Sequence, residues 1–287
     1  MDGFLESMEL ITGTVKSLEG INAECFLKNS GGRKNIPNRK EVVKVIKDLQ
    51  SLLFPDYFKH SEGSENVLSQ TELLLNIYNR LRSQIAGAYE FNGTPPEKSP
   101  EAICDEFIAQ LPLVKMMLVK DIEAIYEGDP AAKCHEEVLI CYPGFYAVSI
   151  YRIANVLYRL RVPLIPRIMT EFAHEKTGVD IHAGATIGEY FCIDHGTGIV
   201  IGETTTIGNR VKIYQGVTLG AKSFKVDENG NPVKDIKRHP DIGNNVVIYA
   251  NATILGGDTK IGDNCVIGGN TWLTHSVEAG QVVYYGK

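Results

Sequence analysis

The sequence lacks the features that mark membrane, secreted and nucleic-acid-binding proteins. It has no run of about 18 apolar residues, so we expect no transmembrane helix. The N-terminus, Met-Asp-Gly-Phe-Leu-Glu, has neither the basic start nor the apolar run of a signal peptide. With 29 basic and 35 acidic residues the net charge is −6, which argues against a broad nucleic-acid face or a polybasic membrane patch. A local basic cluster for a small anionic cofactor is still compatible with this balance.

Cysteine is present, but not in the spacing of metal sites or disulfide scaffolds. None of the six cysteines forms a Cys-x-x-Cys pair. In a chain of 287 residues they do not suggest a disulfide framework. We therefore expect a reducing compartment, the cytoplasm, with most thiols buried as small apolar side chains. A composition of 44% hydrophobic and 22% charged residues excludes a disordered or fibrous chain, and the length predicts about two domains.

Residues 1–165 carry the apolar spacing of α-helices. In Glu41–Phe54 the apolar residues lie four, three and four apart, on one helix face: Val42, Ile46, Leu49 and Leu53. Similar patterns predict helices over 64–89, 99–126 and 143–161. Ser64 is the expected N-cap of the first of these, and Pro112 is expected to break or kink the second. We therefore predict an α-helical domain over residues 1–165.

After about residue 178 the apolar period changes to six. Branched aliphatic residues recur in four runs: Ile181, Ile187 and Ile193; Ile201, Ile207, Ile213 and Leu219; Ile242, Ile248 and Ile254; and Ile261, Ile267 and Leu273. Relative to a strict period of six, the second run begins two residues later than the first run predicts, and the fourth begins one residue later than the third predicts. A period of six is typical of a hexapeptide-repeat parallel β-helix, in which these side chains point inward and stack from coil to coil. Three hexapeptides make one triangular coil, so we predict about four coils within a domain over 166–287.

One long insertion, the loop 220–241, interrupts the repeat. It is rich in turn-forming residues and gives an acidic protein a local positive charge from Lys222, Lys225, Lys234, Lys237 and Arg238. Insertions in a solenoid leave from a coil corner and often carry binding. We favour an anion-binding loop over a loop without function.

Three of the seven histidines lie at places that suit catalysis. His182 lies in Asp180-Ile181-His182, at a corner predicted to be equivalent to that of His195, two hexapeptides earlier. His195 lies in Asp194-His195-Gly196, at a corner where small residues are the rule, and His239 ends the insertion beside Arg238. Asp180 precedes His195 by fifteen residues, which places the two on adjacent coils but three residues out of register. A carboxylate beside an imidazole can fix its tautomer and raise its basicity, and the imidazole can then deprotonate a hydroxyl. A hydrogen bond that only holds the corner explains this pair equally well.

The repeat and its flanking motifs closely resemble serine acetyltransferases of the hexapeptide-repeat acyltransferase superfamily. The matching segments are Val179–Ala185, Ile193–Glu203, Val217–Gly220, Arg238–Pro240, Lys120–Ile122, Asp129–Ala131, Tyr142–Phe145 and Tyr151–Ile153. The resemblance implies an α+β protein with an N-terminal helical domain followed by a left-handed β-helix. It also implies transfer of the acetyl group of acetyl-CoA to the hydroxyl of L-serine. The products would be CoA and O-acetyl-L-serine, in the first step of cysteine biosynthesis from serine.

The resemblance further implies roles for individual residues. His195 would be the general base on the serine hydroxyl, Asp180 would orient it, and His239 would help to bind or activate serine across a groove between subunits. Substrate-binding residues would hold the two charged ends of serine: Arg238 for the carboxylate, and Asp129 and Asp194 for the ammonium. Acetyl-CoA would be the co-substrate, and no metal is expected.

The same resemblance predicts where the pantetheine arm of CoA binds. It would run along the coil edge past Gly220, Ala221, Ala250 and Gly268. Small residues at these positions are also what tight corners require. Many family members have Gly-Gly where this chain has Gly220-Ala221.

The resemblance also extends to partners. A homotrimer follows from the shared groove, while pairing of trimers through the helical domain is left open. L-Cysteine would be a feedback inhibitor. The chain ends at Lys287 without the isoleucine-ended tail of many members, so no complex with O-acetylserine sulfhydrylase is expected through that route.

Three other functions compete with this one. Another hexapeptide-repeat O-acetyltransferase would share the histidine base, but Asp129 together with Arg238 is expected only for a zwitterionic acceptor. A zinc enzyme resembling γ-class carbonic anhydrase could use the imidazoles of His182, His195 and His239. A non-catalytic scaffold would leave the acidic and basic residues at the corners unexplained.

Overall fold

The computed structural model of the chain describes residues 2–20, 36–58, 69–93, 95–224, 226–234 and 236–286. It divides into two units, residues 1–34 and 35–287. The first unit contains α1 (Asp2–Glu19), an amphipathic helix. Among the described residues, no helix is both long enough and apolar enough to cross a membrane.

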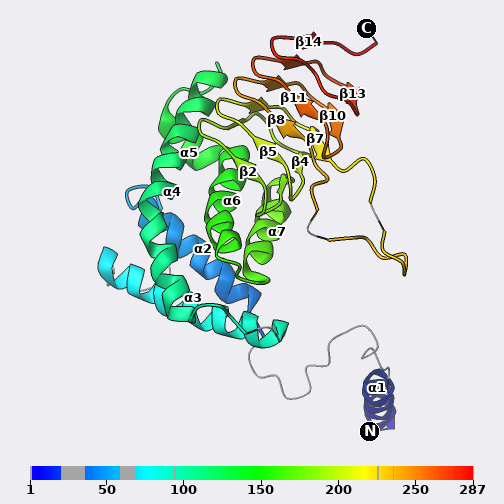
Figure 1. Cartoon of the computed structure of the whole chain (residues 1–287). Coiled ribbons are helices and arrows are strands. Elements are labelled where there is room, and N and C mark those ends of the chain that lie inside the picture. Colours follow the sequence, from blue (N-terminus) through cyan, green and yellow to red (C-terminus); the bar gives the residue numbers. More distant parts are fainter. Residues whose placement is uncertain are drawn as a thin grey trace. The chain divides into compact units, whose positions relative to one another are not determined.

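The second unit begins with helices that pack into one apolar core (Figure 1). In its described residues these helices are α2 (Arg39–Leu53), α3 (Gln70–Asn92), α4 (Pro100–Gly128), α5 (His135–Cys141), α6 (Pro143–Arg159) and α7 (Ile165–Thr177). The four apolar residues predicted to share one face of α2 are all buried. The helices continue to Thr177 and the strands begin at Asp180, while the domain division at residue 165 stays a prediction.

Two predicted details of the helices differ from the structure. Ser64 lies outside the described residues, and α3 is capped by Ser69, whose hydroxyl accepts from the Glu72 amide at 3.2 Å. The Glu72 carboxylate in turn accepts from the Ser69 amide at 2.8 Å, which completes a capping box. α4 is not broken at Pro112. This proline is exposed, so water can solvate the carbonyl that loses its amide partner.

The strands form the three faces of a β-helix. Sheet A has the order β1-β4-β7-β10-β13, sheet B the order β2-β5-β8-β11, and sheet C the order β3-β6-β9-β12-β14, all parallel. The strands are β1 (Asp180–Ile181), β2 (Thr186–Ile187), β3 (Cys192–Ile193), β4 (Val200–Ile201), β5 (Thr206–Ile207), β6 (Lys212–Ile213), β7 (Thr218–Gly220), β8 (Asp241–Ile242), β9 (Val247–Ile248), β10 (Thr253–Leu255), β11 (Lys260–Ile261), β12 (Val266–Ile267), β13 (Trp272–Leu273) and β14 (Val282–Val283). The chain visits sheets A, B and C in turn, and successive coils stack away from the helices (Figure 1).

The six-residue period is confirmed as the source of the core. Every aliphatic residue of the four predicted runs is buried, and those of sheet A lie in register, from Ile181 to Ile201 and on to Leu219. The offset of two between the first runs is also explained. The turn from β3 to β4 spans residues 194–199, whereas the later turns at this corner span 214–217, 249–252 and 268–271. The two additional residues belong to the turn that carries His195.

A buried ion pair joins the helices to the first coil. Arg152 of α6 donates to both carboxylate oxygens of Asp121 in α4, at 2.5 and 2.7 Å, and to the carbonyl of Gly188 at 2.8 Å. Asp121 also accepts from the amide of Phe191, just before β3, at 3.0 Å. Complete burial raises the pKa of Asp121, and the Arg152 bonds offset part of that rise. This network fixes α4 against the coil that bears His195.

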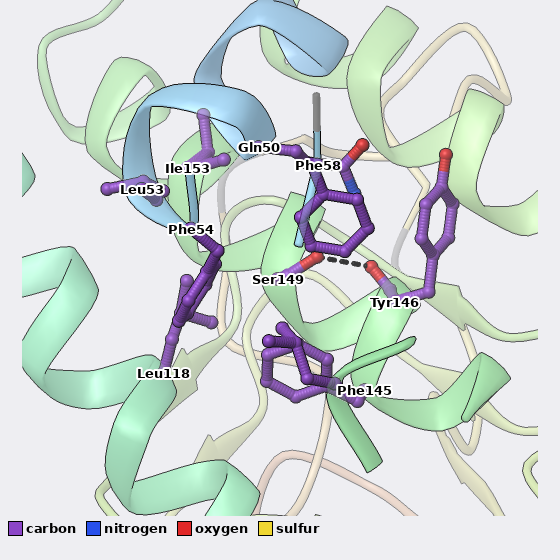
Figure 2. Close-up of a pocket in the computed structure, with 10 residues that line it drawn as sticks. Gln50, Leu53, Phe54, Phe58, Leu118, Phe145, Tyr146, Ser149 and Ile153 are labelled. Atoms are coloured by element: carbon purple, nitrogen blue, oxygen red, sulfur yellow. Dashed lines mark hydrogen bonds between the residues drawn. The ribbon is translucent and has the colours of Figure 1, made fainter. Parts of the chain in front are cut away.

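The helical core also contains a small pocket, shown in Figure 2. Apolar side chains line it, among them Phe54 and Phe145, whose rings meet edge to face at 6.4 Å. Among its lining residues, the Ser149 hydroxyl donates to the Tyr146 carbonyl at 2.8 Å (Figure 2). Its volume of about 10 Å³ has room for about one water molecule, so this pocket is not a substrate site.

Candidate active site

We define the CA corner as the edge where the chain passes from sheet C to sheet A, and His195 lies there. Its backbone is left-handed, with φ of 57°, and its side chain is 71% exposed. The imidazole Nε2 lies 3.7 Å from Oδ1 of Asp194. The other oxygen of Asp194 lies 3.0 Å from Nζ of Lys212. The candidate base is thus held outward from the coil, next to a carboxylate.

Asp129 joins this cluster from the end of α4. Its carboxylate accepts from the Tyr142 hydroxyl at 2.6 Å and from the Ala131 amide at 2.8 Å. These two bonds, with smaller contributions from Lys212 and His195, hold the pKa of Asp129 below its usual range. Asp129, Asp194 and His195, which were predicted to act on one substrate, therefore lie close together within one chain.

Asp180 begins β1, and His195 lies in the turn that leads from this same first coil to β4, the strand that stacks on β1. The Asp180 amide donates to the Ile199 carbonyl at 2.9 Å, and the side chain of Val179 reaches the backbone of Gly196. The hydrogen bonds and ion pairs of the described residues include none between Asp180 and His195, whose carboxylate neighbour is Asp194. The orienting role of Asp180 stays a prediction.

His239 lies at a different edge, the AB corner, where the chain passes from sheet A to sheet B. It is 7% exposed, and its Nδ1 accepts from the Thr204 amide at 3.1 Å, which leaves the ring proton on Nε2. Burial, followed by the nearby Arg238, lowers the pKa of His239 to about 4. The ring lies over Gly202, where a Cβ would come within 2.2 Å of Nε2, so only glycine fits.

Arg238 is held at the same AB corner. Its guanidinium pairs with Glu203, which also accepts from the Tyr158 hydroxyl at 2.8 Å. Burial raises the pKa of Glu203, but the bonds from Tyr158 and Arg238 outweigh it and leave that pKa lowered. His182 follows β1 and lies at this AB corner, so the prediction that its corner is equivalent to that of His195 is wrong. Burial lowers the pKa of His182.

The predicted CoA-binding residues are divided between the two corners. Gly220 ends β7 and Ala221 follows it at the AB corner, whereas Ala250 and Gly268 lie at the CA corner, on coils beyond that of His195. At Gly268 a Cβ would lie 2.9 Å from the Val283 carbonyl, so packing alone requires a small residue there. CoA binding and tight packing therefore both stand as explanations of these small residues.

The structure does not bring the three histidines of the zinc alternative together within one chain. His182 and His239 lie at the AB corner and His195 at the CA corner. Among the described residues, the group with metal-binding geometry is Glu171, His174 and Asp180, with donor atoms within 4.8 Å of one another. Arg167 already pairs with Glu171 in this group.

Sequence reasoning missed Lys212 and Tyr142 as members of the site. Tyr142 belongs to the matching segment Tyr142–Phe145, but no role is predicted for it from the sequence. Lys212 belongs to no motif, and its only signal is its register: it pairs with Cys192, two residues before Asp194, from the next coil.

Comparison with known proteins identifies the family, although no family model matches the chain. A serine acetyltransferase of Synechococcus elongatus is 45% identical over 263 residues, covering 86% of this chain and 81% of the relative. The chain belongs to the serine acetyltransferase family. The serine acetyltransferase of Bacillus subtilis is 41% identical over 161 residues, covering 56% of this chain and 70% of the relative.

Solved serine acetyltransferases share the fold. The structure of Entamoeba histolytica serine acetyltransferase 1 in complex with L-cysteine has a TM-score of 0.73 and 36% identity, covering 83% of this chain and 85% of that one. The enzyme of Neisseria gonorrhoeae in complex with serine has a TM-score of 0.57 and 28% identity, covering 83% and 79%. The predicted fold, helices followed by a left-handed parallel β-helix, is confirmed.

The predicted activity is confirmed as well. As a serine acetyltransferase, the protein transfers the acetyl group of its co-substrate acetyl-CoA to the hydroxyl of L-serine, in cysteine biosynthesis. The family does not support the zinc-enzyme and scaffold alternatives.

Proposed function

We propose that one serine-binding site forms from the CA corner of one chain and the AB corner of its neighbour in a homotrimer. The observation that carries this proposal is the division of the site residues. His195, Asp194 and Asp129 lie at the CA corner, whereas Arg238 and His239 lie at the AB corner. Two edges of one triangular prism face different directions. Rotational symmetry, however, brings unlike edges of neighbouring chains together around a closed ring.

Each corner supplies what the other lacks for a zwitterion. The CA corner offers two carboxylates for the ammonium and an imidazole for the hydroxyl. The AB corner offers the planar guanidinium of Arg238 for the carboxylate of serine. Its pairing with Glu203 aims the guanidinium and leaves other N–H groups free for the substrate. Since Asp129 follows α4, the helical domain over 1–165 forms one wall of this site and, we propose, serves oligomerisation.

In this site His195 acts as the general base. Its imidazole removes the proton from the serine hydroxyl while the oxygen attacks the thioester carbon of acetyl-CoA. The tetrahedral intermediate collapses with cleavage of the C–S bond, and the CoA sulfur takes the proton back from the imidazolium. Asp194, 3.7 Å away, stabilises that imidazolium, and Asp180 at the start of β1 orients the ring.

His239 acts as a hydrogen-bond donor rather than as a second base. Its pKa of about 4 keeps it neutral near pH 7, and the Thr204 amide occupies Nδ1. Only the Nε2–H group is left to face the neighbouring chain, and it donates to the bound serine. The two predicted roles, binding and activation, thus reduce to binding.

L-Cysteine is expected to bind in the same site and to inhibit, because it presents the same ammonium and carboxylate. The Entamoeba enzyme was solved with L-cysteine and the Neisseria enzyme with serine. We place the reaction in the cytoplasm because the free thiols of Cys104, Cys192 and Cys265 suit a reducing compartment.

Release of free CoA thiol from acetyl-CoA with a set of acceptors tests these roles. L-Serine should be the best acceptor, while L-serinamide, which lacks the carboxylate, should lose about tenfold to hundredfold in kcat/KM, the range of a charge-assisted bond. In Arg238→Ala, serine should fall to the level of serinamide, and serinamide itself should change little. Equal use of serine, serinamide and an amino sugar by the wild type would contradict the proposal.

A further inference from the structure

Lys212 is a charged side chain without a role in the reaction described above. It lies on β6, directly beside Cys192 of β3, and faces outward because its neighbour Ile213 fills the core. Its side chain is only 17% exposed. The ammonium donates to the Gly128 carbonyl at 2.6 Å, lies 3.0 Å from Oδ2 of Asp194, and lies 4.5 Å from the ring centroid of Tyr214.

These contacts join separate parts of the site. Gly128 is the last residue of α4 and precedes Asp129, while Asp194 precedes His195. A Cβ at Gly128 would lie 3.2 Å from Sγ of Cys192 and 3.6 Å from Nζ of Lys212, so the end of α4 is packed closely against the coils. A cation also suits this place because the last carbonyls of a helix carry partial negative charge.

Lys212 also balances the charge of this corner. Burial lowers its pKa, but its bonds to Tyr214 and Asp194 outweigh that effect, and the net pKa is raised. It therefore stays charged at neutral pH. Without this cation, the carboxylates of Asp129 and Asp194 would repel each other. The Gly128 carbonyl and the Asp194 carboxylate would also lose the ammonium as their donor.

We propose that Lys212 is a positioning residue for the binding of L-serine. It holds Asp129 and Asp194 in the arrangement that receives the ammonium, and it keeps the free oxygen of Asp194 next to His195. It does this without touching the substrate. The inference rests on the proposed roles of these three residues.

Steady-state kinetics of Lys212→Met and Lys212→Arg test this inference. We expect Lys212→Met to raise KM for L-serine about tenfold to hundredfold, the range of a charge-assisted bond, with KM for acetyl-CoA within about twofold of wild type. Lys212→Arg should regain most of the loss. The matched control is Arg210→Met, which removes an exposed cation 3.9 Å from Glu127, next to the same helix end, and should leave both KM values unchanged.

A second comparison separates positioning from general damage to the fold. In an Asp194→Asn background the cation has lost its carboxylate partner, so adding Lys212→Met should raise KM for L-serine by less than about threefold. If Lys212→Met alone does not fold, this double variant and Lys212→Arg still test whether Lys212 positions the serine-binding carboxylates. An equal rise in KM for both substrates, or an undiminished effect in the Asp194→Asn background, would overturn the inference. Failure of the proposed function would look different, because wild type would then not distinguish serine from serinamide.

Discussion

His195→Asn is expected to lower kcat for serine acetylation by about 10²–10⁴-fold, the usual contribution of a general base. Asparagine removes the basic nitrogen but accepts the left-handed backbone that this corner requires. The same chain already uses asparagine with φ of 55–60° at other corners: Asn245, Asn251, Asn264 and Asn270. The fold should therefore persist, so thermal melting and thiol release measured on the same preparation separate chemistry from stability.

The matched control for this variant is His275→Asn. His275 is also exposed and lies on the last turns of the β-helix, far along the chain from the CA corner of His195. It should retain wild-type kcat. A His195→Asn enzyme within about threefold of wild type, with an intact melting transition, would show that another group takes the proton.

Arg152→Met is expected to cost about 3–5 kcal/mol of unfolding free energy, because it leaves the fully buried carboxylate of Asp121 without its cation. It also removes donors from the carbonyls of Ile187 and Gly188, and so loosens the first coil from α4 and α6. Chemical denaturation at one fixed protein concentration measures the loss, since subunit association makes apparent stability depend on concentration.

Two further variants test the origin of that loss. Arg82→Met breaks the exposed pair with Glu101, in which both side chains are about half exposed, and should cost far less stability than Arg152→Met. The double variant Asp121→Leu/Arg152→Met removes both buried charges and should recover part of the stability. If Arg152→Met lowers the unfolding free energy no more than Arg82→Met does, the loss does not come from an unpaired buried carboxylate at Asp121.

The β-helix could be predicted almost completely from the sequence, whereas the helices could be predicted only in part. Each coil of a solenoid repeats the same requirement for an inward aliphatic residue, so the pattern is redundant and one error does not hide it. Helix ends depend on single residues. Ser64 and Ser69 are equally good N-caps by type, and only the Glu72 partner distinguishes them. No helix is predicted over α7 from the sequence, although Pro166 lies in its first turn, where proline is tolerated.

For the site, motifs indicate which residues take part but not which lie together. The cluster of Asp129 with Asp194 depends on α4 ending beside the first coil, and no spacing in the sequence encodes that contact. Lys212 illustrates the same limit, since its role follows from register between coils rather than from neighbours in the chain. The division of the site between two corners could be found only once each turn had been assigned to an edge.

Complementation between two impaired variants tests the shared site most directly. His195→Asn disables the CA corner and Arg238→Ala the AB corner, and the two chains carry different tags and are expressed together. If each site uses one corner from each of two chains, about a quarter of the sites in a random 1:1 assembly contain both intact corners. Purification through both tags should then return thiol release with L-serine far above that of either variant alone. Activity in the mixed assembly no greater than that of the two separate variants would contradict the account.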